Sequence, residues 1–255
     1  MPTKYPFKNL VFHSGGVRAF AYHGALPVLE EYGILPQIER VAGASAGAMT
    51  AALVSFRLSA QDTVGLFRTL DYSKIPEIKE TIPQRLGVTP PAPIEEGLGR
   101  LAGGLSALAR ISRRFGVYGT SYPYQWMSDI IADQCEGDAR ATFADFRRLG
   151  FRDLYIVTTN ISTHKLAIFS ADTTPDVAVV DALLMSQSIP LFFEAPRFDG
   201  RKLGAGDFYG DGGILNGFPL QIFDEPAYAE DNDWFIGGIN WETLGCHLHA
   251  PEDEA

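Results

Sequence analysis

Two glycine-rich turns near the amino terminus constrain the fold of this chain more than any other feature. The apolar run Asn9–His13 leads into Ser14-Gly15-Gly16. A second short run, Arg40–Ala42, leads into Gly43-Ala-Ser45-Ala-Gly47. Each turn precedes a segment with helical character, and in the first of these, Phe20 to Tyr32, apolar residues recur at helical spacing. Strand, helix, strand and helix in this order predict parallel βαβ units. We therefore expect an α/β fold of three layers, with a mostly parallel sheet and helices on both faces.

Length and charge set the domain organisation and exclude one class of partner. The chain has 255 residues, enough for one domain with a substantial core. Its net charge is −10, and the excess is local, because the chain from Asp224 onward holds nine acids and no Lys or Arg. We expect residues 1–255 to form a single domain with an acidic tail at 250–255. Nucleic acid is excluded as a partner because no basic face is indicated.

The chain carries no pattern typical of secretion or membrane insertion. Its start lacks the long apolar stretch of a signal peptide. The longest uncharged run that could suggest a membrane-spanning helix lies between Arg40 and Arg57. It has 16 residues and is too short to span a bilayer as a helix. The two cysteines, Cys135 and Cys246, are far apart, which fits a reducing compartment. We expect a cytoplasmic protein that contacts membranes peripherally.

The second glycine turn has the pattern of a nucleophile elbow. A serine at a sharp strand-to-helix turn is held at strained backbone angles, so that its hydroxyl projects from the edge of the sheet. Strand and helix nearly touch there, which requires very small neighbours, and Gly43, Ala44, Ala46 and Gly47 meet that requirement. The helix that follows points the positive end of its dipole at the hydroxyl. The pattern also fits a small-residue turn that only packs a helix on a sheet.

The first glycine turn is suited to binding an oxyanion. Adjacent glycines, Gly15 and Gly16, let consecutive backbone N–H groups converge on one point. A phosphate-binding loop is a poor interpretation, because neither Gly-x-Gly-x-x-Gly nor the Walker pattern is present. An ordinary strand-to-helix turn is the remaining alternative. Arg18 fits either a structural salt bridge or a role beside this loop.

A serine nucleophile needs a base, and the residues leave two possibilities open. The chain order Ser45, an aspartate, then His247 or His249 would imitate an α/β-hydrolase triad. The other base is Asp211, in Tyr209-Gly-Asp-Gly-Gly213, where the glycines let the carboxylate approach the serine closely; an ordinary Asp-Gly turn is the alternative for this motif. Cys246 with the two C-terminal histidines matches no zinc spacing, so we expect neither a metal nor a cofactor.

The segment 71–123 differs in composition from its surroundings. Prolines interrupt it, and a helical stripe of apolar residues runs from Ile94 to Ile111. We interpret the segment as a variable, lid-like insertion. Its stripe fits a surface helix packed on the core, a mobile lid or a membrane-surface helix.

Regular structure resumes beyond this segment. The patterns there predict helices over Trp126–Gln134 and Val177–Ser186 and strands over Asp153–Asn160 and Leu166–Ser170. A last core strand is expected over Trp234–Ile239.

Taken in order, the motifs resemble those of the patatin-like phospholipases, lipid acyl hydrolases with a Ser–Asp dyad. His13-Ser-Gly-Gly-Val-Arg18 resembles the glycine-rich loop of that family, and Gly43–Gly47 resembles its nucleophile elbow. Ser186-Gln-Ser-Ile-Pro-Leu-Phe-Phe193 and Asp211-Gly-Gly213 resemble the blocks around its catalytic aspartate. The chain departs from the family at Ser14, where many members have a third glycine, and at Ala19, which replaces a common glycine.

The resemblance assigns a role to each of these positions. Ser45 would be the nucleophile and Asp211 the base, with Gly15, Gly16 and Val17 lining an oxyanion hole. The supporting residues would be Arg18, Gly43, Gly47, Gly212 and Gly213. The implied substrate is a lipid carboxyl ester, such as a phospholipid or lysophospholipid, presented at a membrane interface. Two other functions remain open: an α/β-hydrolase-type esterase that uses a C-terminal histidine, and a non-catalytic lipid-binding scaffold.

Overall fold

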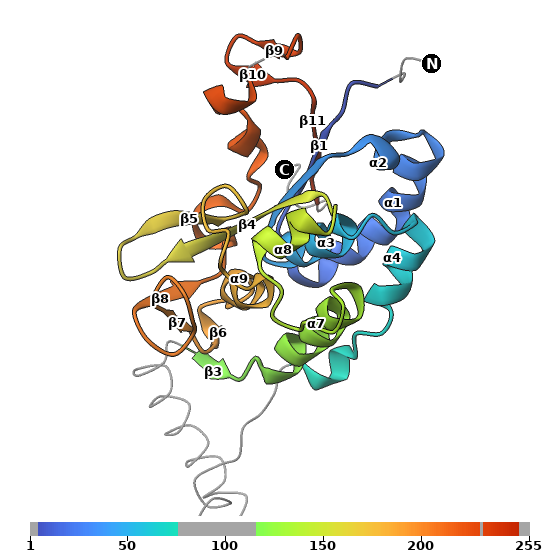
Figure 1. Cartoon of the computed structure of the whole chain (residues 1–255). Coiled ribbons are helices and arrows are strands. Elements are labelled where there is room, and N and C mark those ends of the chain that lie inside the picture. The colour runs from blue at the N-terminus through green and yellow to red at the C-terminus, as the bar shows by residue number, and fades with distance from the viewer. Residues whose placement is uncertain (1–4, 76–115, 230–231, 250–255) are drawn as a thin grey trace, which may run out of the picture.

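A mixed β-sheet forms the centre of the molecule (Figure 1). The computed structural model describes residues 5–75, 116–229 and 232–249. Within them, a seven-stranded sheet has the order β11-β1-β2-β4-β8-β7, and β5 also pairs with β4. The strands are β1 Asn9–Phe12, β2 Arg40–Ala44, β4 Asp153–Asn160, β5 Lys165–Phe169, β7 Arg197–Phe198, β8 Asp207–Gly210 and β11 Thr243–Cys246.

The four strands from β11 to β4 run parallel, which confirms the expected α/β class. β5 and β8 join β4 antiparallel, and β7 pairs antiparallel with β8. Because β1 and β2 are adjacent and parallel, the turns that follow them lie at the same edge of the sheet. This arrangement brings the two glycine turns of the sequence together.

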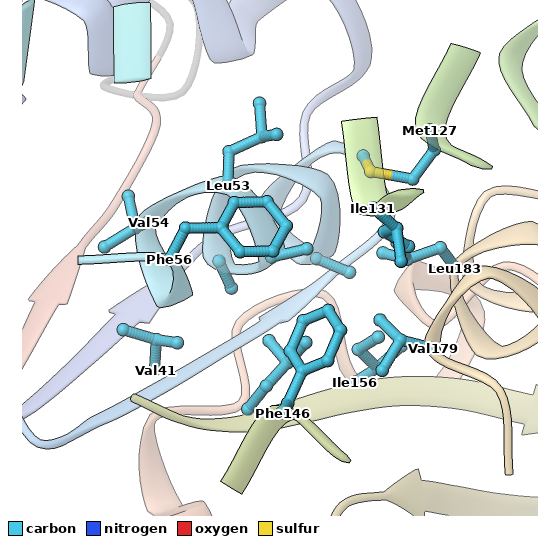
Figure 2. Close-up of a cluster of buried hydrophobic side chains, with 14 of the residues drawn as sticks. Val41, Leu53, Val54, Phe56, Met127, Ile131, Phe146, Ile156, Val179 and Leu183 are labelled. Carbon is cyan, nitrogen blue, oxygen red and sulfur yellow. The ribbon is translucent and has the colours of Figure 1, made fainter. Parts of the chain in front are cut away.

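The larger core lies between one face of the sheet and the α-helices. Side chains alternate along a strand, so Leu10 and Phe12 join this core while Val11 joins a second cluster on the other face. Figure 2 shows Met127 and Ile131 of α7 (Ser121–Gln134) beside Leu183 of α9 (Val179–Ser186) in the larger core. The helices that contribute to it are α1 Tyr22–Glu31, α2 Ile34–Gln37, α3 Ala46–Ser55, α4 Ala60–Phe67, α7 Ser121–Gln134, α8 Phe143–Arg148 and α9 Val179–Ser186.

Short 3₁₀ helices cover part of the second face. Phe223, at the end of η3 (Leu220–Phe223), packs there with Val11, Ala42 and Tyr155. Tyr228, in η4 (Pro226–Tyr228), packs against the same cluster. The second layer on this face is therefore thinner than the α-helical one.

The expectation of a core strand over Trp234–Ile239 is wrong. β9 (Phe235–Ile236) and β10 (Ile239–Asn240) form a separate antiparallel hairpin, with Gly237 and Gly238 at positive φ in its turn. Trp234 is 48% exposed and Ile236 60% exposed, so the apolar run does not enter the core. The last core strand is β11, which pairs with β1.

The other expected elements coincide closely with the structure. The strand Asp153–Asn160 is β4, and the expected helices Trp126–Gln134 and Val177–Ser186 lie within or overlap α7 and α9. The remaining described elements are η1 Gly16–Ala21, η2 Tyr72–Lys74, β3 Gly116–Tyr118, β6 Leu191–Phe193 and α10 Gly213–Asn216.

Two predicted segments lie outside the described residues. The stripe Ile94–Ile111, with most of the expected insertion, falls in 76–115, and the acidic tail is 250–255. Among the helices that the structure describes, none combines the length and apolarity required to cross a bilayer.

Candidate active site

Ser45 occupies a strained turn between β2 and α3. Its backbone has φ 54° and ψ −128°, a region that residues other than glycine rarely adopt. The side chain is 6% exposed and lines a cavity. Because α3 begins at the next residue, the hydroxyl lies at the positive end of that helix. The geometry is that of the nucleophile elbow expected from the sequence.

Gly43 and Gly47 allow the close contacts that this turn requires. A Cβ atom on Gly43 would collide with the carbonyl group of Gly47. A Cβ atom on Gly47 would lie 2.5 Å from the carbonyl oxygen of Phe12 and 2.6 Å from that of His13. Neither contact could be relieved by rotating a side chain, because the obstructing atoms belong to the backbone. The two glycines therefore let α3 pack directly on β1 and β2.

The hydroxyl of Ser45 donates a hydrogen bond to Asp211. Ser45 Oγ lies 2.5 Å from Asp211 Oδ2, although the two residues are 166 positions apart. The other carboxylate oxygen, Oδ1, accepts from the backbone N–H of Gly213 at 2.7 Å. Asp211 is 5% exposed. Burial raises the pKa of its carboxyl above the ordinary value, and the bonds from Ser45 and Gly213 counteract this only in part.

The main chain of Asp211 is fixed to β4. Its carbonyl oxygen accepts from Thr159 Oγ1 at 3.0 Å, and its N–H donates to the carbonyl of Ser188 at 2.9 Å. The next residue, Gly212, is essential to this approach, since a Cβ atom there would collide with the carbonyl oxygen of Val157. The Asp-Gly-Gly motif thus brings the carboxylate to the elbow by packing backbone against backbone.

Ser186 is a site residue that the sequence patterns did not identify. Its hydroxyl accepts the backbone N–H of Ser45 at 2.9 Å and donates to the carbonyl of Val157 at 2.7 Å. The side chain is fully buried at the end of α9. In the sequence, Ser186 stands out only as the first residue of the segment 186–193 that resembles the family. That resemblance implies no contact with Ser45. The hydroxyl links the strained turn to the central strand of the sheet.

The first glycine turn faces the same cavity as Ser45. Gly16 and Val17 begin η1 and line that cavity. The first N–H groups of a helical turn have no partner within the turn, so these two amides are suited to receiving an oxyanion. Gly15 packs against Leu248 instead: a Cβ atom there would lie 2.6 Å from Leu248 Cδ1. Arg18 is exposed, and its backbone N–H donates to the carbonyl of Gly15 at 3.1 Å.

The two C-terminal histidines lie elsewhere. His247 stacks on His13, with ring centroids 4.4 Å apart, and also contacts Phe218. Neither His247 nor His249 lines the cavity. Among the described residues, no group of three or more His, Cys, Asp or Glu side chains is arranged to hold a metal ion.

The cavity beside Ser45 is apolar and has a volume of about 380 Å³. Its walls come from η1, α1, α3, α4, η2, α7, α9, and β6 with the loop before it. Met49, Met127 and Leu183 supply part of the apolar surface. Such a cavity is suited to a hydrocarbon chain whose end is held at the serine.

An ion pair between a buried carboxylate and a partly exposed guanidinium supports one wall of the cavity. Asp181 in α9 is fully buried and pairs with both terminal nitrogens of Arg140, at 3.0 and 2.7 Å. Tyr124, which lines the cavity, donates to the same carboxylate and accepts from Arg140. These bonds tie the start of α7 to α9 across the cavity wall.

Comparison with known proteins agrees with this architecture. A family model described as patatin-like phospholipase matches residues 10–224, so the chain belongs to that family. The family resemblance inferred from the sequence motifs is confirmed.

Individual relatives cover different parts of the chain. YqhO of Bacillus subtilis is 27% identical over 223 residues, which is 84% of this chain and 66% of YqhO. The probable lipid hydrolase 463L of Invertebrate iridescent virus 6 is 31% identical over 86 residues, 32% of this chain and 28% of that protein. The crystal structure of VipD from Legionella pneumophila matches 98% of this chain with a TM-score of 0.59 at 20% identity, which supports the fold. The chain spans 52% of VipD and less than two thirds of YqhO.

Proposed function

We propose that this chain is a serine acyl hydrolase that cleaves carboxyl esters of lipids, of the phospholipase A or lysophospholipase type. The observation that carries the proposal is the hydrogen bond from Ser45 Oγ to Asp211 Oδ2, made at the edge of an apolar cavity. Membership of the patatin-like phospholipase family and the local similarity to a probable lipid hydrolase support the same class of substrate.

In the first half of the reaction, Asp211 takes the proton of the Ser45 hydroxyl while Oγ bonds to the ester carbonyl carbon. The carbonyl electron pair moves onto the oxygen, and the amides of Gly16 and Val17 stabilise that charge. The ester C–O bond then breaks, and protonated Asp211 returns the proton to the departing alkoxide. An acyl group remains on Ser45.

In the second half, water replaces the alcohol. Asp211 takes a proton from the water molecule, whose oxygen attacks the acyl carbon, and the C–Oγ bond breaks as Oγ regains a proton from Asp211. A carboxylate is a weaker base than an imidazole. Positioning of the substrate and the oxyanion hole must therefore contribute more to lowering the activation barrier. The leaving group of an ester is easier to expel than that of an amide, which favours esters.

Labelling by a fluorophosphonate probe and hydrolysis of a long-chain para-nitrophenyl ester test the proposal together. Ser45→Ala removes the nucleophile, so both signals should disappear, and Asp211→Asn should reduce both strongly. The matched control is Ser55→Ala at the other end of α3, because Ser55 is also buried and its hydroxyl donates to the carbonyl of Ala52 within its own helix. Its activity should stay close to wild type.

The remaining alternatives give different results. An unchanged rate in Ser45→Ala would contradict the assignment of the nucleophile. Loss of activity in His247→Ala and His249→Ala together with full activity in Asp211→Asn would favour the histidine-dependent esterase. A wild-type protein that neither labels nor hydrolyses any ester in the presence of lipid would favour a non-catalytic scaffold.

A further inference from the structure

An unusual set of apolar side chains surrounds the opening of the cavity. We define this apolar rim as Val17, Phe20, Tyr72, Ile189, Leu191 and Phe192. Their exposed fractions range from 38% for Tyr72 and Phe192 to 70% for Val17. All except Leu191 line the cavity that contains Ser45, so the rim is continuous with the candidate active site. Exposed apolar patches of this kind mark surfaces that bind another phase or another molecule.

Backbone conformation and ring contacts hold the side chains of the apolar rim in place. Leu191 is 62% exposed and has φ 67°, a conformation that a bulky residue adopts only under strain. The strain holds an apolar side chain toward solvent beside Ile189 and Phe192. Elsewhere on the rim, Phe20 and Tyr72 are in ring contact, with centroids 4.8 Å apart. Three separate parts of the chain, at 17–20, 72 and 189–192, therefore present apolar groups at the same opening.

We propose that the apolar rim docks the protein on the surface of a lipid aggregate, so that an acyl chain passes from the lipid into the cavity without entering water. This inference rests on the proposed function. Each methylene group exposed to water costs about 0.8 kcal/mol, so drawing a free chain through a hydrated opening would be unfavourable. Contact between the rim and the lipid surface removes that exposure.

The positions of the acidic residues favour an orientation of the protein in which the rim faces the lipid surface. The turns after β1 and β2 lie at the carboxyl ends of these strands, whereas the β9–β10 hairpin precedes the amino end of β11, which runs parallel to them. The hairpin therefore lies at the end of the sheet away from the rim, together with the described acids that precede β11: Asp224, Glu225, Asp233 and Glu242 (Figure 1). Docking by the rim keeps these acids away from an anionic surface.

Partition onto phosphatidylcholine vesicles measures the docking directly. The experiment uses the Ser45→Ala chain, so that hydrolysis does not alter the vesicles during measurement. Leu191→Asn removes the most exposed apolar group of the loop, and asparagine tolerates positive φ better than leucine does. We expect this variant to partition roughly threefold to tenfold more weakly, since removing part of a leucine's burial is worth about that factor.

A matched control separates docking from general hydrophobicity. Ile236 is 60% exposed on the hairpin at the other end of the molecule, almost the same as Leu191. Ile236→Asn should leave partition within error of the parent. Leu191→Trp should strengthen partition, because tryptophan favours the interfacial region. Thermal unfolding of each variant shows that it is folded.

Three results overturn the proposal: no partition by the parent chain, equal losses in Leu191→Asn and Ile236→Asn, or no loss in Leu191→Asn. Because binding is measured without the nucleophile, partition without any ester hydrolysis by the wild type would refute the proposed function alone. Ester hydrolysis with unaffected partition in Leu191→Asn would refute the docking surface alone.

Discussion

Replacing Ser186 with alanine tests whether one buried hydroxyl holds the turn at Ser45 in its strained form. The change removes the acceptor of the Ser45 N–H and the donor to the Val157 carbonyl. A buried N–H left without a partner costs about 1–3 kcal/mol. The strained backbone of Ser45 stores a similar amount, about 1–3 kcal/mol. The two magnitudes are comparable, so loss of the bond is enough to let the turn relax and move the hydroxyl.

The expected result is a slower reaction at the serine in a protein that still folds. A displacement of about 1 Å at a reacting group lowers rates by about 10²-fold, so we expect fluorophosphonate labelling to slow by roughly 10- to 100-fold. The unfolding free energy should fall by about 1–3 kcal/mol. The assay follows labelling rate, kcat and KM for the ester, and thermal unfolding in parallel.

Ser188→Ala is the matched control for this experiment. Ser188 is also buried, and its hydroxyl donates to the carbonyl of Leu184. Its own carbonyl, retained in the variant, accepts the N–H of Asp211. It should lose comparable stability with little change in labelling. Wild-type labelling in Ser186→Ala, or equal slowing in both variants, would refute the view that the Ser186 hydroxyl positions the elbow.

Three further predictions concern the base, the elbow and the core. Asp211→Asn should lower kcat by about 10²–10⁴-fold. It should also raise Tm at neutral pH, because the stability from a carboxyl with a raised folded pKa is fully present below its ordinary pKa and is lost as pH rises through the raised value. Because the pKa of Asp211 is raised, wild-type kcat/KM should begin to fall on acidification at a pH above the ordinary aspartate pKa. A pH profile in which this fall occurs only at or below the ordinary pKa would contradict the prediction. Gly43→Ala should abolish labelling and destabilise the fold by about 1–3 kcal/mol, because its Cβ would collide with the Gly47 carbonyl, whereas Gly24→Ala, with open space around it, should be neutral or stabilising in urea unfolding. Arg152→Met should lower the unfolding free energy by about 3 kcal/mol or more in urea unfolding, since the buried guanidinium donates to the carbonyls of Ile38, Val54 and Leu35, and a loss below 1 kcal/mol would show that water replaces it.

Local patterns made much of the elbow predictable from the sequence. The strain at Ser45 and the close packing at Gly43 and Gly47 follow from small residues between an apolar strand and a helix. The pairing of Ser45 with Asp211 was expected through the family resemblance, because no local rule joins residues so far apart. The contact from Ser186 could not be derived, since a serine at the end of a helix has the same local pattern whether it binds solvent or another turn.

The carboxyl-terminal part shows why apolar composition alone misleads. Trp234–Ile239 is rich in residues that favour strands, and it does form strands, but its two glycines fold it back on itself and leave the tryptophan exposed. β11 has a weak strand pattern, Thr-Leu-Gly-Cys, and its place is set by pairing with β1. Gly245 within it leaves room for Phe218 and Leu220, a requirement that only the tertiary structure reveals.

β4 serves as a common anchor for Ser45 and Asp211. Val157 of this strand holds Ser186 and through it the Ser45 turn, while Thr159, two residues on, holds the carbonyl of Asp211. The distance between the Ser45 hydroxyl and the Asp211 carboxylate is therefore fixed by hydrogen bonds to a single strand. Small movements of α7 or of the turn at Tyr72 would change the width of the cavity. They would leave the distance between Ser45 and Asp211 unchanged. If the proposed function holds, the cavity can adapt to acyl chains of different bulk while the distance from Ser45 to Asp211 stays the same.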